Sequence, residues 1–485
     1  CVCSLLLHRV HAWRCPSLLA SLQRKGPDKM ADGGAASRGP PDGSPPAALL
    51  LLQQPLLHAY EARKDPAACG REAHGHGFGL DPDGGGGGGA SFVRTCFNGL
   101  NGLSGVGLLS IPYALSEGGW LSLALLLLVA AVCCYTGLLL QRCMDASPAV
   151  RGYPDIGALA FGRGGRLAAS AFLYAELYLV AIGFLILEGD NLDKLFPGTS
   201  LSLGLRGAAL VVSGKQLFVV LVALVILPTT WLRSLGVLAY VSASGVLASA
   251  VVVVCVLWTA LADGVGFRAR GRMLNVSGLP TALGLYTFCY CGHAIFPTLC
   301  ISMKEKKRFS RVLVICFAAC TLNYASMAIL GYLMYGDDVK SQVTLNLPEG
   351  KVVSKLAIYT TLINPFSKYA LMVTPLATAV EEKLLAAGRG GKSRSVSVLV
   401  RTLLVVTTVV VALAVPFFGH LMALVGSLLS VMASMLLPCI FYLKIFGAAR
   451  CGRAEVALVA TIIVLGSVVL ATGTYASVKK IVQDY

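Results

Sequence analysis

The stretch GLSGVGLLSIP, residues 102–112, lies inside an apolar segment long enough to cross a lipid bilayer, yet it contains three glycines and a proline. Both residue types destabilise a helix. The hydrocarbon core of a bilayer offers no water to the backbone groups that an interruption leaves unpaired. An interruption at this depth is tolerated where the backbone lines a cavity or is bound by other parts of the protein. The stretch therefore predicts a broken membrane helix beside an internal site.

The composition agrees with a membrane location. The 485 residues are 56% hydrophobic and 13% charged, with a mean hydropathy of +0.74. Soluble domains carry about 25% charged residues, so the chain is expected to be an integral protein of the lipid bilayer. The net charge of +16 is spread between apolar blocks rather than gathered on one face, and no recognition motif accompanies it. Nucleic acid is therefore not an expected partner.

The first 90 residues differ from the rest in composition. From Met30 to Ala90 the chain is rich in Gly, Pro and Ala and closes with GGGGGGA at 84–90. Such a segment cannot bury enough apolar surface to fold, and we expect a disordered cytosolic N-terminal tail. Met30 is a plausible start, which would make residues 1–29 a gene-model extension; a cleaved signal or transit peptide is the alternative.

Eleven apolar blocks follow, each able to span a hydrocarbon core of about 30 Å. They cover residues 93–115, 118–141, 168–190, 216–234, 236–262, 278–302, 312–335, 356–380, 398–417, 420–443 and 454–476. With a cytosolic N-terminus, the cytosolic loops hold more Lys and Arg than the opposite loops, as membrane proteins prefer. The clearest of these loops carries KEKKRFSR at 304–311.

The first and sixth blocks carry matching interruptions. One reads GVGLLSIP at 105–112 and the other YCGHAIFP at 290–297, each with a glycine five residues before a proline. The sixth block comes five crossings after the first, an odd number, so the two segments run in opposite directions. Interrupted spans at matching places in two halves indicate a transporter site built from inverted repeats. Two proline kinks with close glycine packing are the alternative.

Two half-helices of this kind match the two charged ends of an amino acid. The N-terminal end of a half-helix is partially positive and suits a carboxylate. The carbonyl groups that end the other half can bind an ammonium group or a cation. Asn101, just before the first interruption, is expected to be a polar cavity residue.

Three ionisable side chains lie deep in the apolar blocks: Glu176, His293 and Lys368. A charge at mid-bilayer costs about 2.5–3.5 kcal/mol on insertion scales, so such groups usually face a cavity or each other. Proton coupling is one interpretation. The alternatives are a structural Glu176–Lys368 pair and a His293 that never changes charge. Lys368 could also occupy the place of a sodium ion between two helices, which would favour proton over sodium coupling.

Four stretches together resemble the amino acid/auxin permease family, and within it the plant vacuolar amino acid transporters, relatives of the vesicular inhibitory amino acid transporter. They are FNGLNGLSGVGLLSIPYAL (97–115), LYAELYLVAIGFLILEGDNL (173–192), FCYCGHAIFPTLCISMK (288–304) and INPFSKYALMVTPLA (363–377). The resemblance covers residues 91–485. It implies an all-α membrane protein with eleven transmembrane helices, the first ten forming a 5+5 inverted repeat of the leucine-transporter type.

The resemblance also implies a function and a site. We expect a proton-coupled secondary transporter of neutral amino acids in the vacuolar membrane, working by alternating access as antiporter or symporter. The expected substrate-binding residues are Asn101, Ser104, Gly105, Val106, Gly107, Tyr290, Cys291, Gly292 and His293, and the expected proton-coupling residues are Glu176, His293 and Lys368. An amino acid importer or auxin importer of the plasma membrane is an alternative, and a membrane amino acid sensor with little turnover is another. No nucleophile–base set, nucleotide loop or acidic cluster predicts an enzyme, a cofactor or a metal site.

Overall fold

The computed structural model describes residues 90–205, 208–231, 236–267, 271–386, 394–448 and 450–484. Of the predicted tail at 1–90, residues 1–89, which include the segment 1–29, lie outside the described residues. Ala90 forms an isolated bridge with Met303: its N–H donates to the Ser302 carbonyl at 2.7 Å, and Lys304 N–H donates to its carbonyl at 3.0 Å. The start of the first apolar block is thereby bound to the end of the sixth.

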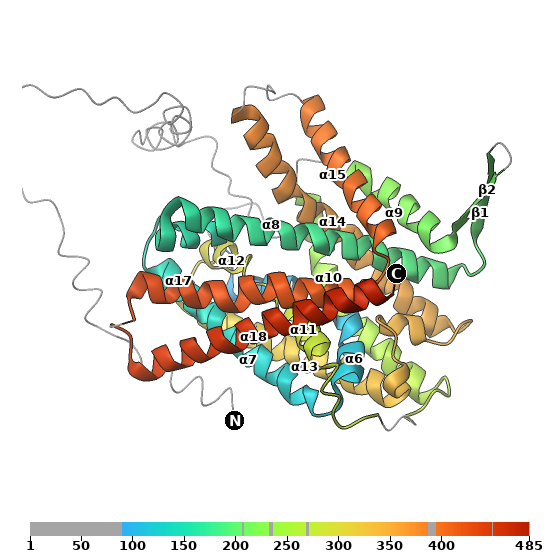
Figure 1. Ribbon diagram of the computed structural model, residues 1–485, viewed down its shortest axis with the longest axis horizontal. Coiled ribbons are helices and arrows are strands. Elements are labelled where there is room, and N and C mark those ends of the chain that lie inside the picture. The colour runs from blue at the N-terminus through green and yellow to red at the C-terminus, as the bar shows by residue number, and fades with distance from the viewer. Residues whose placement is uncertain are drawn as a thin grey trace, which may run out of the picture. The chain divides into compact units, whose positions relative to one another are not determined.

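The described residues are predominantly helical, and each of the predicted apolar blocks coincides with helix (Figure 1). The expected α-helical membrane fold is confirmed. In chain order the elements are α5 (Phe92–Leu103), α6 (Gly107–Gly118), α7 (Ser122–Asp145), α8 (Tyr153–Leu195), β1 (Ser200–Leu205), β2 (Ala208–Ser213), α9 (Gly214–Thr230), α10 (Gly236–Leu261), α11 (Leu279–Cys289), α12 (Phe296–Ser302), η1 (Lys306–Arg308), α13 (Phe309–Tyr335), η2 (Gly336–Asp338), η3 (Val343–Asn346), α14 (Val352–Ala386), α15 (Arg394–Ala414), α16 (Phe418–Leu424), η4 (Val425–Ser430), η5 (Met432–Leu436), α17 (Leu437–Phe446) and α18 (Arg453–Gln483).

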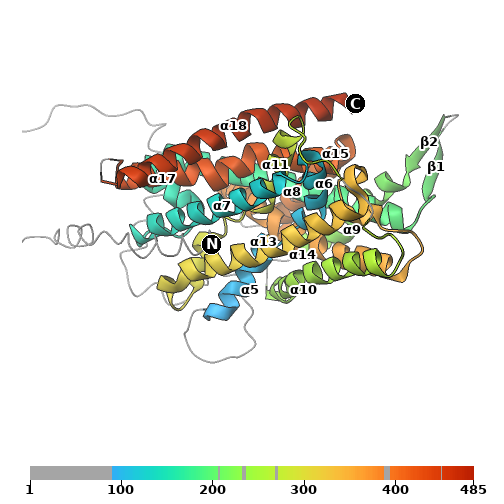
Figure 2. The ribbon, with the colours of Figure 1, turned by 90° about the horizontal axis from the view of Figure 1, so that it is seen from below.

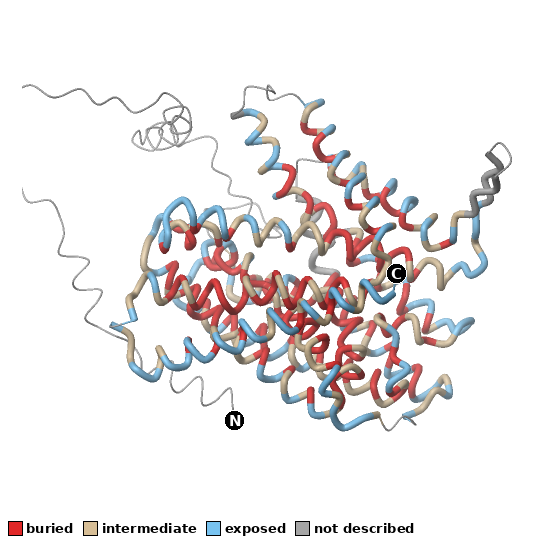
Figure 3. Tube along the Cα trace, in the orientation of Figure 1, coloured by how far each residue is buried: buried red, intermediate tan, exposed pale blue. Residues whose placement is uncertain are grey.

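The outer surface of the helices is apolar. Among the described residues, six helical stretches are long and apolar enough to cross a membrane, and α9, α11 and the part of α10 from Gly245 are shorter apolar helices. Buried residues lie on the inner faces, while the outer faces are exposed (Figure 3). Large hydrophobic side chains such as Val410 on α15 and Val464 on α18 belong to these exposed faces. A helix that is hydrophobic all round suits lipid contact rather than water.

The third block is longer than the sequence predicted. Helix α8 starts at Tyr153, well before residue 168, and bends at Phe161 and Gly162, where Gly162 has φ of +64°. The two arms of the bend touch backbone to backbone: a Cβ on Gly157 would lie 2.4 Å from the Gly165 carbonyl oxygen. Phe161 and Gly162 leave the helical conformation and turn the chain here. Apolar blocks of membrane-spanning length do not reveal the first arm.

A β-hairpin between the third and fourth blocks was also not predicted. Strands β1 and β2 are antiparallel, with Ser200 opposite Ser213 and Leu205 opposite Ala208. The hairpin projects from the helices at the C-terminal end of α8 (Figure 1). Its strands are only six residues each, too short to register as a membrane-spanning block.

The tenth block contains wide helical turns. Between α16 and α17, the segments η4 and η5 are π-helical, a conformation that is rare and frequent at functional sites. This block crosses α11 at very short range, because a Cβ on Gly426 would lie 1.8 Å from the Gly284 carbonyl oxygen. Small residues let membrane helices approach this closely.

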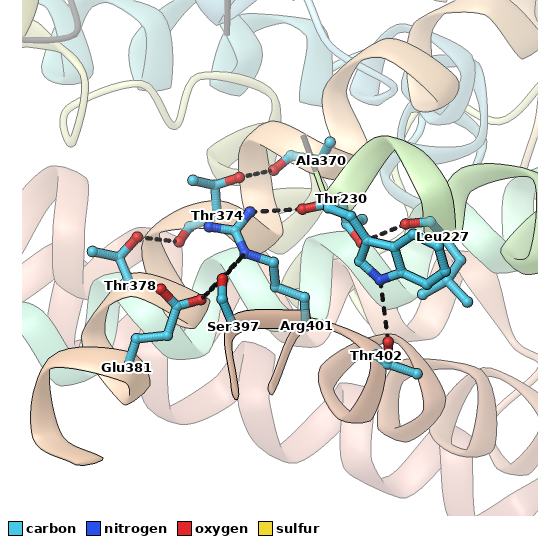
Figure 4. Close-up of polar contacts among 10 residues, drawn as sticks. Leu227, Thr230, Ala370, Thr374, Thr378, Glu381, Ser397, Arg401 and Thr402 are labelled. Carbon is cyan, nitrogen blue, oxygen red and sulfur yellow. Dashed lines mark hydrogen bonds and ion pairs between the residues drawn. The ribbon is translucent and has the colours of Figure 1, made fainter. Parts of the chain in front are cut away.

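Helices α9, α14 and α15 are joined by a buried arginine (Figure 4). The Arg401 guanidinium donates to the Thr230 carbonyl at the end of α9 at 2.6 Å and to Glu381 on α14 at 3.2 Å. Ser397, one turn earlier on α15, donates to the same Glu381 oxygen at 2.7 Å. Helices α10 and α14 pack together, as do α17 and α18 (Figure 2).

Candidate functional site

Both predicted interruptions are present. The first helix breaks between Leu103 and Gly107, and the sixth breaks between Cys289 and Phe296. The two breaks lie against each other: a Cβ on Gly107 would come within 2.7 Å of the Cys289 sulfur, and one on Gly292 within 2.7 Å of the Leu103 side chain. Glycine at these positions therefore lets the two broken helices approach closely.

A buried lysine binds the end of the first half-helix. The Lys368 Nζ, on α14, donates to the carbonyl oxygens of Asn101 at 3.0 Å and Ser104 at 2.9 Å. The lysine is 7% exposed. The C-terminal end of a helix is partially negative and favours a cation, so the ammonium lies where the dipole of α5 attracts it.

A tyrosine joins the ends of both half-helices. The Tyr324 hydroxyl, on α13, lies 2.6 Å from the Leu103 carbonyl oxygen and 3.2 Å from the Cys289 carbonyl oxygen. A single donor thus serves the last turns of α5 and α11. Sequence reasoning missed Tyr324, because one tyrosine within an apolar block is usually a packing residue; the only available signal is that a buried hydroxyl seeks a partner.

A cavity lies beside the first break. It is a small, partly open hollow between the break, α10 and α14. Its lining residues are Gly105, Val106, Leu108, Leu109, Ala248, Ser249, Val252, Thr360, Thr361 and Asn364. A Cβ on Gly105 would meet no atom within 4 Å.

The cavity has an apolar wall and a few polar groups. Helix α6 starts at its edge, and no side chain caps the N-terminus of that helix. The Ser104 hydroxyl donates to Ser249 on α10 at 2.8 Å. Gly245, one turn earlier on α10, lets two amides approach: its Cβ would lie 2.4 Å from Asn101 Oδ1 and 2.8 Å from Asn364 Oδ1. An uncapped helix N-terminus and nearby hydroxyl and amide groups can together bind a small zwitterion.

Two of the expected site residues point away from this cavity. The Tyr290 hydroxyl donates to Thr321 on α13 at 3.0 Å, and its ring stacks on Phe317. The His293 Nε2 lies 3.0 Å from the Cys133 carbonyl oxygen and 2.9 Å from the Thr136 hydroxyl, both on α7. Since a carbonyl only accepts hydrogen bonds, Nε2 carries the proton in this arrangement. The sixth-helix break therefore faces α7 and α13 at these positions.

Glu176 belongs to a different polar cluster. Its Oε1 accepts from the Ser430 hydroxyl at 2.6 Å and from the Cys291 thiol at 2.9 Å, and Ser434 donates to the Cys291 sulfur at 3.3 Å. Glu176 is 6% exposed. The cluster joins α8, the sixth-helix break and the π-helical turns. Glu176 and Lys368 thus bind different partners, so the structural pair considered from the sequence is not formed.

The fold and the site define a class of protein. Two interrupted membrane helices that touch beside an internal cavity are the architecture of a secondary transporter. No group of three or more metal-ligating side chains occurs among the described residues.

The comparison with protein families agrees with this class. Residues 88–479 match the family described as transmembrane amino acid transporter protein, and the chain belongs to this family. The protein is therefore a multi-pass membrane protein of a family of amino acid transporters rather than of enzymes.

Similar proteins are known from Arabidopsis thaliana. Amino acid transporter AVT1I is 51% identical over 394 residues, which cover 81% of this chain and 96% of that protein. Amino acid transporter AVT1B is 45% identical over 394 residues, which cover 81% of this chain and 72% of that protein. A solved structure of a Na⁺-coupled sialic acid symporter, substrate-bound and outward-open, aligns at 15% identity and a TM-score of 0.49, covering 79% of this chain and 88% of that one.

Proposed function

We propose that this protein is a proton-coupled secondary transporter of neutral amino acids in the vacuolar membrane, with a cytosolic N-terminus and alternating access to the site. The proposed topology is eleven crossings, the first ten as a 5+5 inverted repeat, within a transporter domain at 91–485. Family membership and the two touching helix breaks support it. In this proposal the protein binds an amino acid as its substrate, uses protons as the coupling ion and is embedded in the lipid bilayer.

The substrate would bind at the first break. Its carboxylate would meet the N-terminal end of α6 at Gly105–Gly107, and its ammonium group the hydroxyl and amide groups of Ser249, Thr361 and Asn364. The full proposed set of substrate-site residues is Asn101, Ser104, Gly105, Val106, Gly107, Tyr290, Cys291, Gly292 and His293. Tyr290 and His293 would then act by positioning the sixth-helix break, since their polar atoms bind α13 and α7 in this conformation.

The contact between Lys368 and α5 is the observation that supports coupling to protons rather than to sodium. Broken transporter helices offer their carbonyl oxygens to a sodium ion or a proton carrier. In this protein two such oxygens, of Asn101 and Ser104, already accept hydrogen bonds from a lysine ammonium. While Lys368 is protonated, its positive charge takes the place that a sodium ion would need.

Three residues would carry or transmit the proton. Protonation of Glu176 would turn one carboxyl oxygen from acceptor to donor and so change its bonds to Cys291 and Ser430. Loss of the proton from Lys368 would release the α5 carbonyls. The His293 Nδ1 is buried and has no hydrogen-bond partner in the described part of the chain, so it offers an acceptor for a proton.

Reconstituted transport tests the proposal. The purified protein would be placed in proteoliposomes, and labelled alanine, glutamine and leucine would be followed with and without a pH gradient, in sodium or in choline buffer. We expect flux that depends on the pH gradient and not on sodium. The sign of the gradient effect distinguishes antiport from symport. Binding without flux would indicate a sensor, and uptake confined to whole cells rather than isolated vacuoles would indicate a plasma-membrane importer.

A further inference from the structure

A second buried carboxyl group lies on α8, outside the site described above. Glu188 is 0% exposed, and neither of its carboxyl oxygens has a hydrogen-bond partner in the part of the chain that the structure describes. It lies twelve residues after Glu176, which is about 18 Å along a helix. The two carboxyl groups are therefore separate sites.

On the N-terminal side of Glu188 its own helix is apolar. Phe184, four residues earlier, and Leu185, three residues earlier, are buried on the same face, and the adjacent Leu187 is fully buried. An isolated carboxylate without hydrogen bonds is far more costly to bury than the neutral acid. The neutral, protonated form of Glu188 is therefore the form that fits this conformation.

The loop between α13 and α14, residues 336–351, is bound to the same end of α8. One turn after Glu188, the Asn191 amide donates to Gln342 of the loop at 2.6 Å, and Gln342 in turn donates to Asp190 at 2.9 Å. The Lys194 ammonium donates to the carbonyls of Leu345 and Leu347, each at 2.6 Å. These bonds hold the loop over the last turns of α8.

The charged groups that neighbouring elements bring to this end of α8 have other partners or are exposed. Lys215 of α9 pairs with Asp190, and Lys351, just before α14, pairs with Asp263. His420 of α16 pairs with Asp484, and Lys355 of α14 is exposed.

On the loop, Asp337 pairs with Arg272, and Asp338 and Lys340 are exposed. The short helix η3, Val343–Asn346, carries no charge. Within the described residues, no cation is bonded to Glu188.

We propose that Glu188 is a proton-binding residue of the transport cycle, an inference that rests on the proposed function. The acid is neutral while the 336–351 loop is bound to α8. When the loop leaves α8, water reaches the carboxyl group and accepts its proton, and the reverse step reloads it. Opening of this end of the protein is thereby linked to one proton.

The test compares wild type with Glu188→Gln, because the glutamine amide has nearly the shape of the protonated acid. Asp338→Asn, which changes an exposed acid of the loop, is the matched control. Each protein would be reconstituted, and uptake of labelled alanine, glutamine and leucine would be measured by counterflow at equal pH and by net uptake under a pH gradient. We expect Glu188→Gln to keep counterflow within about twofold and to lose at least about fivefold of the acceleration by the pH gradient. Asp338→Asn should behave as wild type.

The outcomes separate this inference from the proposed function. A wild type that shows counterflow but no response to the pH gradient overturns proton coupling and this inference with it. A responsive wild type with an equally responsive Glu188→Gln overturns this inference alone. Infrared difference spectra provide a second readout: a protonated-carboxyl band that persists in Glu176→Gln should be lost in Glu188→Gln, whereas any band from Glu176 should remain in Glu188→Gln. If Glu188→Gln does not fold, Glu188→Met, which is also neutral and of similar length, is measured in the same way.

Discussion

Replacing Lys368 by methionine tests the central contact of the site. Methionine has a similar length and no charge, so Lys368→Met removes both hydrogen bonds to the α5 carbonyls of Asn101 and Ser104 without opening a large space. The helix break then loses the cation at its negative end.

The expected loss of stability is smaller than the two bonds suggest. A hydrogen bond to a charged group contributes about 1.5–3 kcal/mol, so the pair contributes about 3–6 kcal/mol. Against this, burying an ammonium group costs several kcal/mol, and methionine does not carry that cost. The remaining penalty is that of two buried carbonyls without a donor, about 1–3 kcal/mol each. We therefore expect Lys368→Met to fold, with a moderately lower free energy of unfolding.

Transport should be affected far more than stability. The carbonyls of α5 adjoin the cavity, so a displaced half-helix changes the site itself, and we expect counterflow of labelled alanine, glutamine or leucine to fall at least about tenfold. Lys355→Met, an exposed lysine on the same helix, is the control and should leave both counterflow and thermal unfolding unchanged. Wild-type counterflow in Lys368→Met would refute the reasoning.

Sodium gives the experiment a second readout. If the ammonium group occupies a cation position, sodium chloride should raise the thermal midpoint of Lys368→Met, whereas choline chloride should not. Wild type should respond equally to both salts. A variant that ignores sodium would mean that these carbonyls do not form a cation site.

Three further changes test the neighbouring contacts. Gly105→Ala puts a methyl group into the open cavity and should weaken substrate affinity at least about fivefold at an unchanged thermal midpoint. In Gly107→Ala the methyl group meets Cys289 and should lower the thermal midpoint. Equal effects of the two variants on affinity and on thermal midpoint would contradict the placement of the cavity. Tyr324→Phe removes the donor shared by the two half-helices and should lower the free energy of unfolding, measured by chemical denaturation, by about 1–3 kcal/mol. An unchanged free energy of unfolding would mean that other groups satisfy the Leu103 and Cys289 carbonyls. Glu176→Gln keeps an acceptor for its two donors and should flatten the pH profile of net uptake; an unchanged profile would assign this residue to structure.

Much of the fold could be predicted because it depends on local chemistry. A block of apolar residues must form its own backbone hydrogen bonds in a bilayer and therefore becomes a helix. The breaks near Gly105 and Gly292 could be predicted for the same reason, since glycine and proline weaken a helix wherever they stand. The bend at Gly162 and the β1–β2 hairpin were not predicted, because neither interrupts or forms a block of membrane-spanning length.

The partners of the polar side chains could not be predicted. Glu176, His293 and Lys368 were recognised as unusual from their depth alone, but their contacts with Ser430, the Cys133 carbonyl and α5 join segments far apart in the chain. The sequence around Tyr324 and Glu188 does not distinguish a hydroxyl or carboxyl group with a function from one that only packs.

The sequence by itself determined that this chain is a helical membrane protein and where its two helices are interrupted, because both properties follow from solvation of the backbone within a few turns. Only the tertiary structure decided that the first break opens on a cavity, that the ammonium of Lys368 satisfies the end of α5, and that Tyr290 and His293 turn toward other helices. The physical reason is that a side-chain hydrogen bond depends on the position and rotation of two packed helices, and many distant residues set these together.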